Sequence, residues 1–300
     1  MRINPIVKKD LQVSSRSMRL AWGLFGYEAI LAIAFLLAML VIRDESRSLY
    51  GNGNIYNAMV YLFPVIAIAQ ICIIALITPI ITASSISGEK ERQTFDVMLT
   101  TAMSPFAIVF GKVTSAVIRI MFYVLGSLPI MALSFVVGGL SWGTLLLYLA
   151  TVLLLAVFSG SIGIFCSAIC RKSITAVILA FVCYFVVYGM TFLPLLLRLI
   201  MGYNDGGECL LMLLWNPAAF FEEYFMLTMT GQSLLSGTNT FGKNDVGAIT
   251  YWLVKNELWV YVSAGCILIL TLVFMLLAAW KVNPMHTSGG RKKSKKKKEN

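Results

Sequence analysis

The sequence predicts an all-α integral membrane protein with six transmembrane helices, an N-terminal interfacial helix and short helices in an outer loop between spans five and six. Of its 300 residues, 59% are hydrophobic and only 13% are charged, and the mean hydropathy is +0.83. Soluble domains carry about 25% charged residues, because polar side chains must cover the surface that faces water. A surface this poor in charge must face lipid, which excludes a soluble enzyme. The same apolar content excludes a disordered chain.

Residues 1–20 are expected to form a helix that lies in the cytoplasmic headgroup plane. Apolar side chains recur near helical spacing: Ile3, Ile6, Val7 and Leu11. Basic or polar side chains take other positions: Lys8, Lys9, Gln12, Arg16 and Arg19. This pattern is typical of interfacial helices, and the alternative is an irregular basic leader. The apolar stretch that follows lacks a small-residue cleavage site, so we expect a retained span and not a cleaved signal peptide.

Six apolar stretches are long enough to cross a bilayer, which takes about 20 residues in a helix. They are Ala21–Ile42, Tyr61–Ala83, Val113–Leu140, Thr144–Cys170, Ile174–Leu197 and Leu258–Trp280. Together they define a transmembrane domain over residues 21–280. No stretch alternates apolar and polar residues with period two, so a transmembrane barrel is not expected.

The distribution of Lys and Arg orients the chain with both termini in the cytoplasm, because cytoplasmic segments are enriched in these residues. In this orientation few basic residues lie outside: Arg43, Arg47, Arg198, Lys243 and Lys255. All others except the intramembrane Arg119 lie inside. The predicted location is therefore the cell membrane, with a cytoplasmic loop over residues 84–112 and an outer loop over residues 198–257.

Most of the net charge of +10 lies in the C-terminal segment 281–300. Its basic residues are Lys281, Arg291, Lys292, Lys293, Lys295, Lys296, Lys297 and Lys298. A local basic tail is not a nucleic-acid-binding face, and it is expected to lie against anionic lipids of the inner leaflet.

We expect no cofactor or metal on this chain. Gly237–Asn244 has the spacing of a phosphate-binding loop, but it ends in Asn where a hydroxyl must bind magnesium. Cys166 and Cys170 share a helix face, but their span contains no His, Asp or Glu to complete a metal site.

The cytoplasmic loop carries the most informative pattern. A charge cluster, Glu89–Arg92, is followed by Phe95, Met98 and Leu99 at helical spacing, which predicts a short helix with one apolar face. Ser104 and Pro105 then form a helix start. Such a helix could bind a cytosolic partner or could only pack beneath the transmembrane helices.

This loop resembles the signature of permease subunits of ATP-binding-cassette transporters in the type-2 export family. The matching residues are Glu89, Lys90, Glu91, Arg92, Thr94, Asp96, Met98, Leu99, Ser104, Ile108, Gly111 and Lys112. The sequence departs at Gln93, where family members usually have Gly, and at Ala102, where many have Pro. The resemblance extends to the predicted topology of the whole chain.

The resemblance implies that residues 88–101 contain a coupling helix that docks on a cytosolic ATPase subunit. The implied coupling residues are Glu89, Lys90, Glu91, Arg92, Thr94, Phe95, Asp96, Met98 and Leu99. ATP and magnesium would bind on that partner. The chain would be a non-catalytic permease that pairs with a second copy or a related permease and exports a substrate by alternating access. The sequence does not identify that substrate, although the apolar spans favour an amphipathic one.

Two further groups of residues are functional candidates. Glu28 and Arg119 are ionisable residues within spans, which are costly unless paired, so we expect an ion pair between them or snorkelling of Arg119. In the outer loop, Asn216 and Pro217 predict a helix start. The helix that follows would act as a gate or as a structural lid through its aromatic residues Phe220, Phe221, Tyr224 and Phe225.

Other classes of membrane protein remain as alternatives. A scaffold or sensor could use the same loop to bind an ATPase for signalling without transport. A lipid-modifying enzyme is disfavoured because no span offers a catalytic constellation. A secondary transporter is disfavoured because coupling ions require several carboxylates near the midplane.

Overall fold

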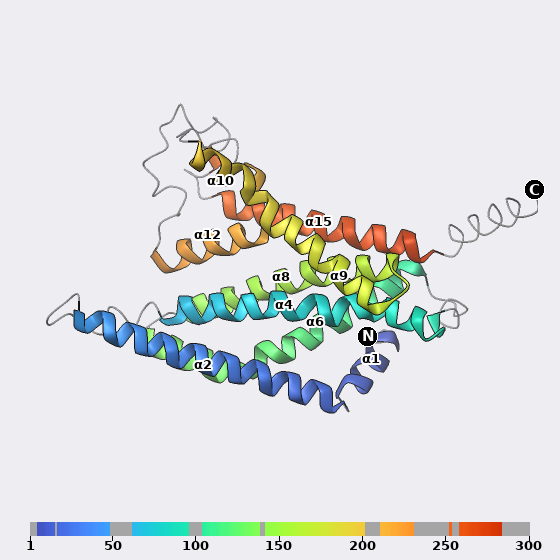
Figure 1. The fold of residues 1–300 in the computed structure, drawn as a ribbon, viewed down its shortest axis with the longest axis horizontal. Helices are drawn as coiled ribbons and strands as arrows, with labels where there is room; N and C mark the ends of the chain where they lie inside the picture. Colours follow the sequence, from blue (N-terminus) through green and yellow to red (C-terminus); the bar gives the residue numbers. More distant parts are fainter. Residues whose placement is uncertain are drawn as a thin grey trace, which may run out of the picture. The chain divides into compact units, whose positions relative to one another are not determined.

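The computed structural model describes residues 5–15, 17–48, 62–95, 104–138, 142–201, 211–230, 252–253 and 258–283. Every regular element in these residues is a helix (Figure 1), which confirms the all-α fold class. Six of the described helical segments are long and apolar enough to cross a membrane. They are Leu20–Arg43, Leu62–Glu91, Pro105–Gly126, Trp142–Ile169, Ser173–Phe192 and Leu258–Val282.

The chain divides into two compact units. The first contains residues 1–82 and 107–160, and the second contains residues 83–106 and 161–300. Two long helices, α4 (Leu62–Glu91) and α8 (Trp142–Ile169), contribute to both units.

The first unit contains the N-terminal helices and most of the third span. These helices are α1 (Pro5–Ser15), α2 (Met18–Ser48), α6 (Pro105–Gly126) and α7 (Leu128–Gly138). Two aromatic pairs join helices within this unit. Tyr27 of α2 meets Tyr123 of α6 edge to face, with ring centroids 5.5 Å apart. Phe63 of α4 meets Tyr148 of α8 in the same edge-to-face geometry. Edge-to-face packing of this kind adds stability beyond the area it buries.

The predicted N-terminal helix forms α1, and an ion pair fixes it to α6. The Lys112 ammonium lies 3.0 Å from an Asp10 carboxylate oxygen, and the Ser115 hydroxyl donates to the same oxygen at 3.2 Å. Lys112 is buried, while Lys8 and Lys9 on the other face of α1 are exposed. Sequence reasoning missed Asp10, although its spacing from Val7 and Leu11 places it on the inner face.

The third span begins earlier than predicted and is interrupted. The Ser104–Pro105 helix start is confirmed, so α6 begins eight residues before the predicted Val113 and ends at Gly126. The Ser127 hydroxyl donates to the Val124 carbonyl, and the Ser127 carbonyl accepts the first hydrogen bond of α7 from Met131 N–H. Pro129 follows in the first turn of α7, where its missing N–H costs nothing. Hydropathy alone could not locate this break, because the residues on both sides are apolar.

The second unit contains the fifth and sixth spans and an outer-loop helix. The fifth span starts as α9 (Ser173–Tyr184), passes through a π-helical turn (Phe185–Gly189) and a 3₁₀ turn (Met190–Phe192), and continues as α10 (Leu193–Ile200). The remaining helices are α12 (Pro217–Thr230) and α15 (Leu258–Val282), which contact each other (Figure 1).

Asn216 joins the outer-loop helix to the irregular part of the fifth span. Its side-chain oxygen accepts from Ala218 N–H at 2.7 Å, which confirms the predicted cap of α12. Its side-chain nitrogen donates to the Tyr188 carbonyl in the π turn at 3.0 Å and to the Thr191 hydroxyl at 2.6 Å. A wide turn disrupts the regular carbonyl pairing of an α-helix, so a buried amide that reaches this carbonyl stabilises the irregular geometry.

Asn216→Ala is expected to lower the free energy of unfolding by about 2–3 kcal/mol, because it removes both the cap and the bridge to the π turn. Asn216→Ser keeps a cap but cannot reach Tyr188, so its loss should be about half as large. Thermal unfolding of the purified variants in detergent measures both. Equal losses for Ala and Ser would contradict a stabilising role for the bridge.

Candidate functional site

The charge cluster of the cytoplasmic loop forms the end of α4, which extends two turns beyond the predicted limit at Ala83. Its last turn closes as a Schellman motif: Thr94 N–H donates to the Glu89 carbonyl at 3.0 Å and Gln93 N–H donates to the Lys90 carbonyl at 3.2 Å. Gln93 therefore has a positive φ of 60°. This explains why a glycine suits the position in the resembling family, since only Gly adopts this conformation without strain.

Lys90 reaches the carboxyl end of α8. Its ammonium donates to the Ala168 carbonyl and lies 3.4 Å from the Cys170 carbonyl. A cation at this end complements the negative pole of the helix dipole. The same ammonium lies 5.4 Å from the centre of the Phe95 ring, which is buried.

Glu91 reaches the amino end of α9. One carboxylate oxygen accepts from Ser173 N–H at 3.1 Å and from the Ser173 hydroxyl at 2.8 Å. The preceding residue, Lys172, makes no side-chain cap of its own. Glu91 therefore supplies the cap from another part of the chain, and its charge complements the positive pole of α9.

A buried hydroxyl extends this contact one turn deeper. Ser167 Oγ of α8 accepts from the backbone N–H groups of Ile86 and Ser87 at 2.9 and 2.8 Å. Ser167 belongs to the small-residue face of the fourth span, with Ser159 and Gly163, and it is fully buried. At this point the small side chain allows close packing of α4 and α8, as expected in lipid.

These contacts divide the coupling candidates into two groups. Lys90 and Glu91 bind the ends of α8 and α9. Arg92 and Thr94 form the second group, and their side chains are exposed on the turn that follows α4. Beside them, Arg171 and Lys172 of the loop between α8 and α9 are also exposed. Three other candidates, Asp96, Met98 and Leu99, lie outside the described residues, and so does the apolar helical face predicted for them.

The predicted ion pair between Glu28 and Arg119 is wrong: within the described residues these side chains do not pair. Glu28 lies level with Gly126 at the end of α6, where an added Cβ would be 2.8 Å from its carboxylate oxygen. Arg119 lies two turns earlier, about 10 Å along the helix, and its Nε donates to the Ser115 carbonyl. The expectation of equal depth failed because α6 starts eight residues before the apolar stretch.

The aromatic residues of the outer loop are mostly buried. Phe220, Phe221 and Phe225 of α12 are at most 5% exposed, and Tyr224 is half-buried. The Ser263 hydroxyl of α15 donates to the Leu214 carbonyl just before α12. These side chains form part of the core of the second unit, and a gating role for them stays a prediction.

Within the described residues, no three His, Cys, Asp or Glu side chains come together as metal ligands. The sulfur atoms of Cys166 and Cys183 lie 3.7 Å apart. The candidate functional surface is the exposed turn at the end of α4, Arg92–Thr94.

Gln93→Gly is expected to raise the free energy of unfolding by about 1 kcal/mol, because glycine relieves the left-handed strain at this position. Thr94→Gly is the matched control, which should destabilise the chain because Thr94 Oγ1 donates to the Glu89 carbonyl. The melting temperatures of the two variants, compared with that of wild type, test this prediction. A lower melting temperature for Gln93→Gly would contradict the assigned turn.

Comparison with known protein families matches residues 44–280 to the model described as ABC-2 family transporter protein. No curated protein matches the chain. The matched region begins just after the first candidate span, includes the second to the fifth, and covers all but the last two residues of the sixth. It also includes the end of α4, whose charge cluster Glu89–Arg92 resembles the family signature. The chain therefore belongs to the ABC-2 transporter family, as a multi-pass membrane permease.

Proposed function

We propose that this permease is the membrane half of an ATP-driven exporter and that residues 88–101 couple it to a separate ATPase subunit. The ATPase binds ATP and magnesium in the cytosol, where both termini of the permease also lie. Two permease copies, identical or related, enclose the pathway and alternate between inward and outward exposure. The cargo is amphipathic, since the spans are apolar.

The observation that carries this proposal is the pair of contacts made by Lys90 and Glu91. Through them, the end of the second span binds the end of the fourth and the start of the fifth. A force on the exposed residues Arg92–Thr94 therefore acts on three spans together. Charge-assisted hydrogen bonds are about twice as strong as neutral ones, so this junction can transmit a force without opening.

The mechanism follows from this connection. ATP binding draws the ATPase subunits together, and the docked segment moves with them. Because the nucleotide binds the two conformations with different affinity, it shifts the permease from one to the other. Hydrolysis removes that difference and returns the permease to its resting conformation.

Arg92→Glu is expected to weaken docking of the ATPase subunit by about tenfold or more, because an exposed charge at an interface is reversed. Lys281→Glu, an exposed cation at the end of α15, is the matched control and should not weaken it. Copurification of the ATPase with each variant, quantified against wild type, tests this. Equal recovery of the ATPase with wild type, Arg92→Glu and Lys281→Glu would refute the assignment of the docking surface.

Glu91→Ala is expected to leave copurification of the ATPase nearly unchanged but to lower its permease-dependent turnover severalfold, because the start of α9 is released. The exposed Glu222→Ala on α12 is the control. The measurement is the ATPase rate of the purified complexes that contain wild type, Glu91→Ala or Glu222→Ala. Unchanged turnover in Glu91→Ala would instead favour a scaffold that binds the ATPase without receiving its motion.

A further inference from the structure

The end of the second unit at which α8 and α15 finish carries more positive charge than its own chain neutralises. Arg171 and Lys172 lie in the turn between α8 and α9, and Lys281 lies in the last turn of α15. All three side chains are exposed, and within the described residues none of them makes an ion pair. The Glu91 carboxylate interacts electrostatically with Lys172, but it is already hydrogen-bonded to Ser173. The excess charge therefore favours an anion from outside the chain.

Two packed aromatic rings set the register between α8 and α15. Phe165 of α8 and Phe274 of α15 have ring centroids 5.5 Å apart. As the fourth and sixth spans, the two helices cross the membrane in the same direction. Arg171 lies six residues beyond the first ring, and Lys281 lies seven residues beyond the second. Both basic residues are thus about 10 Å further along, so the turn and the end of α15 present their charges at the same level.

Apolar side chains beside these cations identify that level as the headgroup layer of the membrane. Ile169 and Ile174 lie on either side of the α8–α9 turn, and both are exposed. Trp280, which is also exposed, precedes Lys281, and its ring centre lies 5.2 Å from the Lys281 ammonium. Tryptophan is enriched where the hydrocarbon core meets the headgroups. The cations therefore lie beside lipid, which makes a lipid a better match than a soluble protein.

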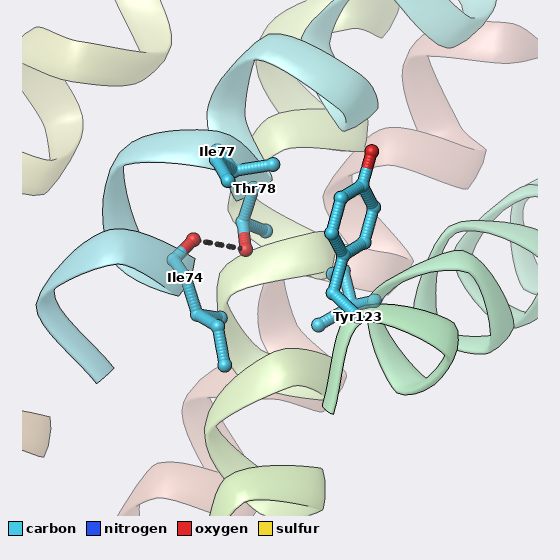
Figure 2. Close-up of a pocket in the computed structure, with 5 residues that line it drawn as sticks. Ile74, Ile77, Thr78 and Tyr123 are labelled. Carbon is cyan, nitrogen blue, oxygen red and sulfur yellow. Dashed lines mark hydrogen bonds between the residues drawn. The ribbon is translucent and has the colours of Figure 1, made fainter. Parts of the chain in front are cut away.

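The hollow inside the first unit does not provide an alternative binding site. It lies between α4 and α6, and its lining consists of Ile74, Ile77, Thr78, Ile120 and Tyr123 (Figure 2). It leaves no space for a water-sized molecule. The Thr78 hydroxyl already donates to the Ile74 carbonyl at 2.7 Å (Figure 2). The exposed cations of the second unit are therefore the stronger basis for a ligand.

We propose that Arg171, Lys172 and Lys281 bind the phosphate headgroup of an anionic phospholipid, whose acyl chains lie along the exposed Ile169 and Ile174. Arginine presents a fork of N–H donors that fits phosphate oxygens, and the two lysines add positive charge. Basic groups between transmembrane helices at this depth suit such headgroups. One bound lipid joins the α8–α9 turn to the end of α15. The inference depends on neither transport nor an ATPase.

The test measures which lipid contacts Trp280, using the purified full-length chain in bilayers of phosphatidylcholine and phosphatidylglycerol. One of the two lipids carries brominated acyl chains, which quench tryptophan fluorescence only at short range. Subtracting the signal of Trp280→Phe isolates this tryptophan. Phosphatidylglycerol should associate there about fivefold more tightly than phosphatidylcholine, because a single basic residue at a lipid surface already contributes that much. The exposed Trp142 at the opposite end of α8, isolated with Trp142→Phe, should show little preference.

Variants locate the site. Arg171→Gln combined with Lys172→Gln should lower the preference at Trp280 nearly to that of the control tryptophan, and Lys281→Gln should lower it severalfold. Lys8→Gln combined with Lys9→Gln removes two exposed cations from α1 instead and is the matched control, which should keep the preference. Arg171→Lys retains the charge and should keep most of it. The C-terminal tail is present in every variant, so its attraction to anionic lipid is common to all.

Each outcome supports or overturns the proposal. An unchanged preference in Arg171→Gln/Lys172→Gln overturns it, and so does an equal loss in Lys8→Gln/Lys9→Gln, which would reveal only general attraction to the membrane surface. Loss of the preference on adding inorganic phosphate at constant ionic strength overturns lipid as the source. If Arg171→Gln/Lys172→Gln instead impairs only ATPase copurification, these cations belong to the docking surface. Because the quenching is measured without the ATPase, failure of the coupling proposal leaves it unaffected.

Discussion

The carboxyl end of α8 and the amino end of α9 are separated by only three residues, and the charges that satisfy both ends come from one turn of α4. Lys90 binds the negative pole and Glu91 binds the positive pole. At the amino end of α9, Lys172 makes no side-chain cap that could replace Glu91. The position of the exposed surface at Arg92 depends on this arrangement, because the Schellman turn that presents it begins at the same residues.

The same two charges illustrate why a charged motif is hard to interpret from sequence alone. A run of Glu, Lys, Glu and Arg at a membrane surface is typical of solvated residues available to a partner. Here the two central members, Lys90 and Glu91, contact their own chain, and Arg92 at the end of the run is exposed. Adjacent positions on a helix lie about 100° apart, so one short run can serve an internal contact and an external one.

Much of the fold was predictable because the bilayer imposes a simple requirement on length and hydropathy. The six spans, the helix start at Pro105 and the cap at Asn216 all follow from local patterns.

The predictions that failed concern which residues of two different helices lie at the same depth and contact each other. Arg119 and Glu28 looked equally deep only because the start of α6 was placed at the first apolar residue, and Asp10 was missed because a single acid among lysines carries little signal. The contacts of Lys90 and Glu91 join positions about 80 residues apart, so no local pattern could reveal them. The left-handed turn at Gln93 was signalled, since a family glycine is replaced there.

A π turn arises when one extra residue is accommodated within an α-helix. In the fifth span that residue lies between Phe185 and Gly189, and Asn216 holds the carbonyl of Tyr188. Removing one residue from this segment would restore a regular helix, but it would rotate everything beyond it by about 100°. Thr191 would then leave the reach of Asn216, and the loop helix that Asn216 caps would lose its attachment. The extra residue of the π turn therefore determines which side of the fifth span faces the outer-loop helix. Relatives of this chain should keep or lose that residue and the equivalent of Asn216 together.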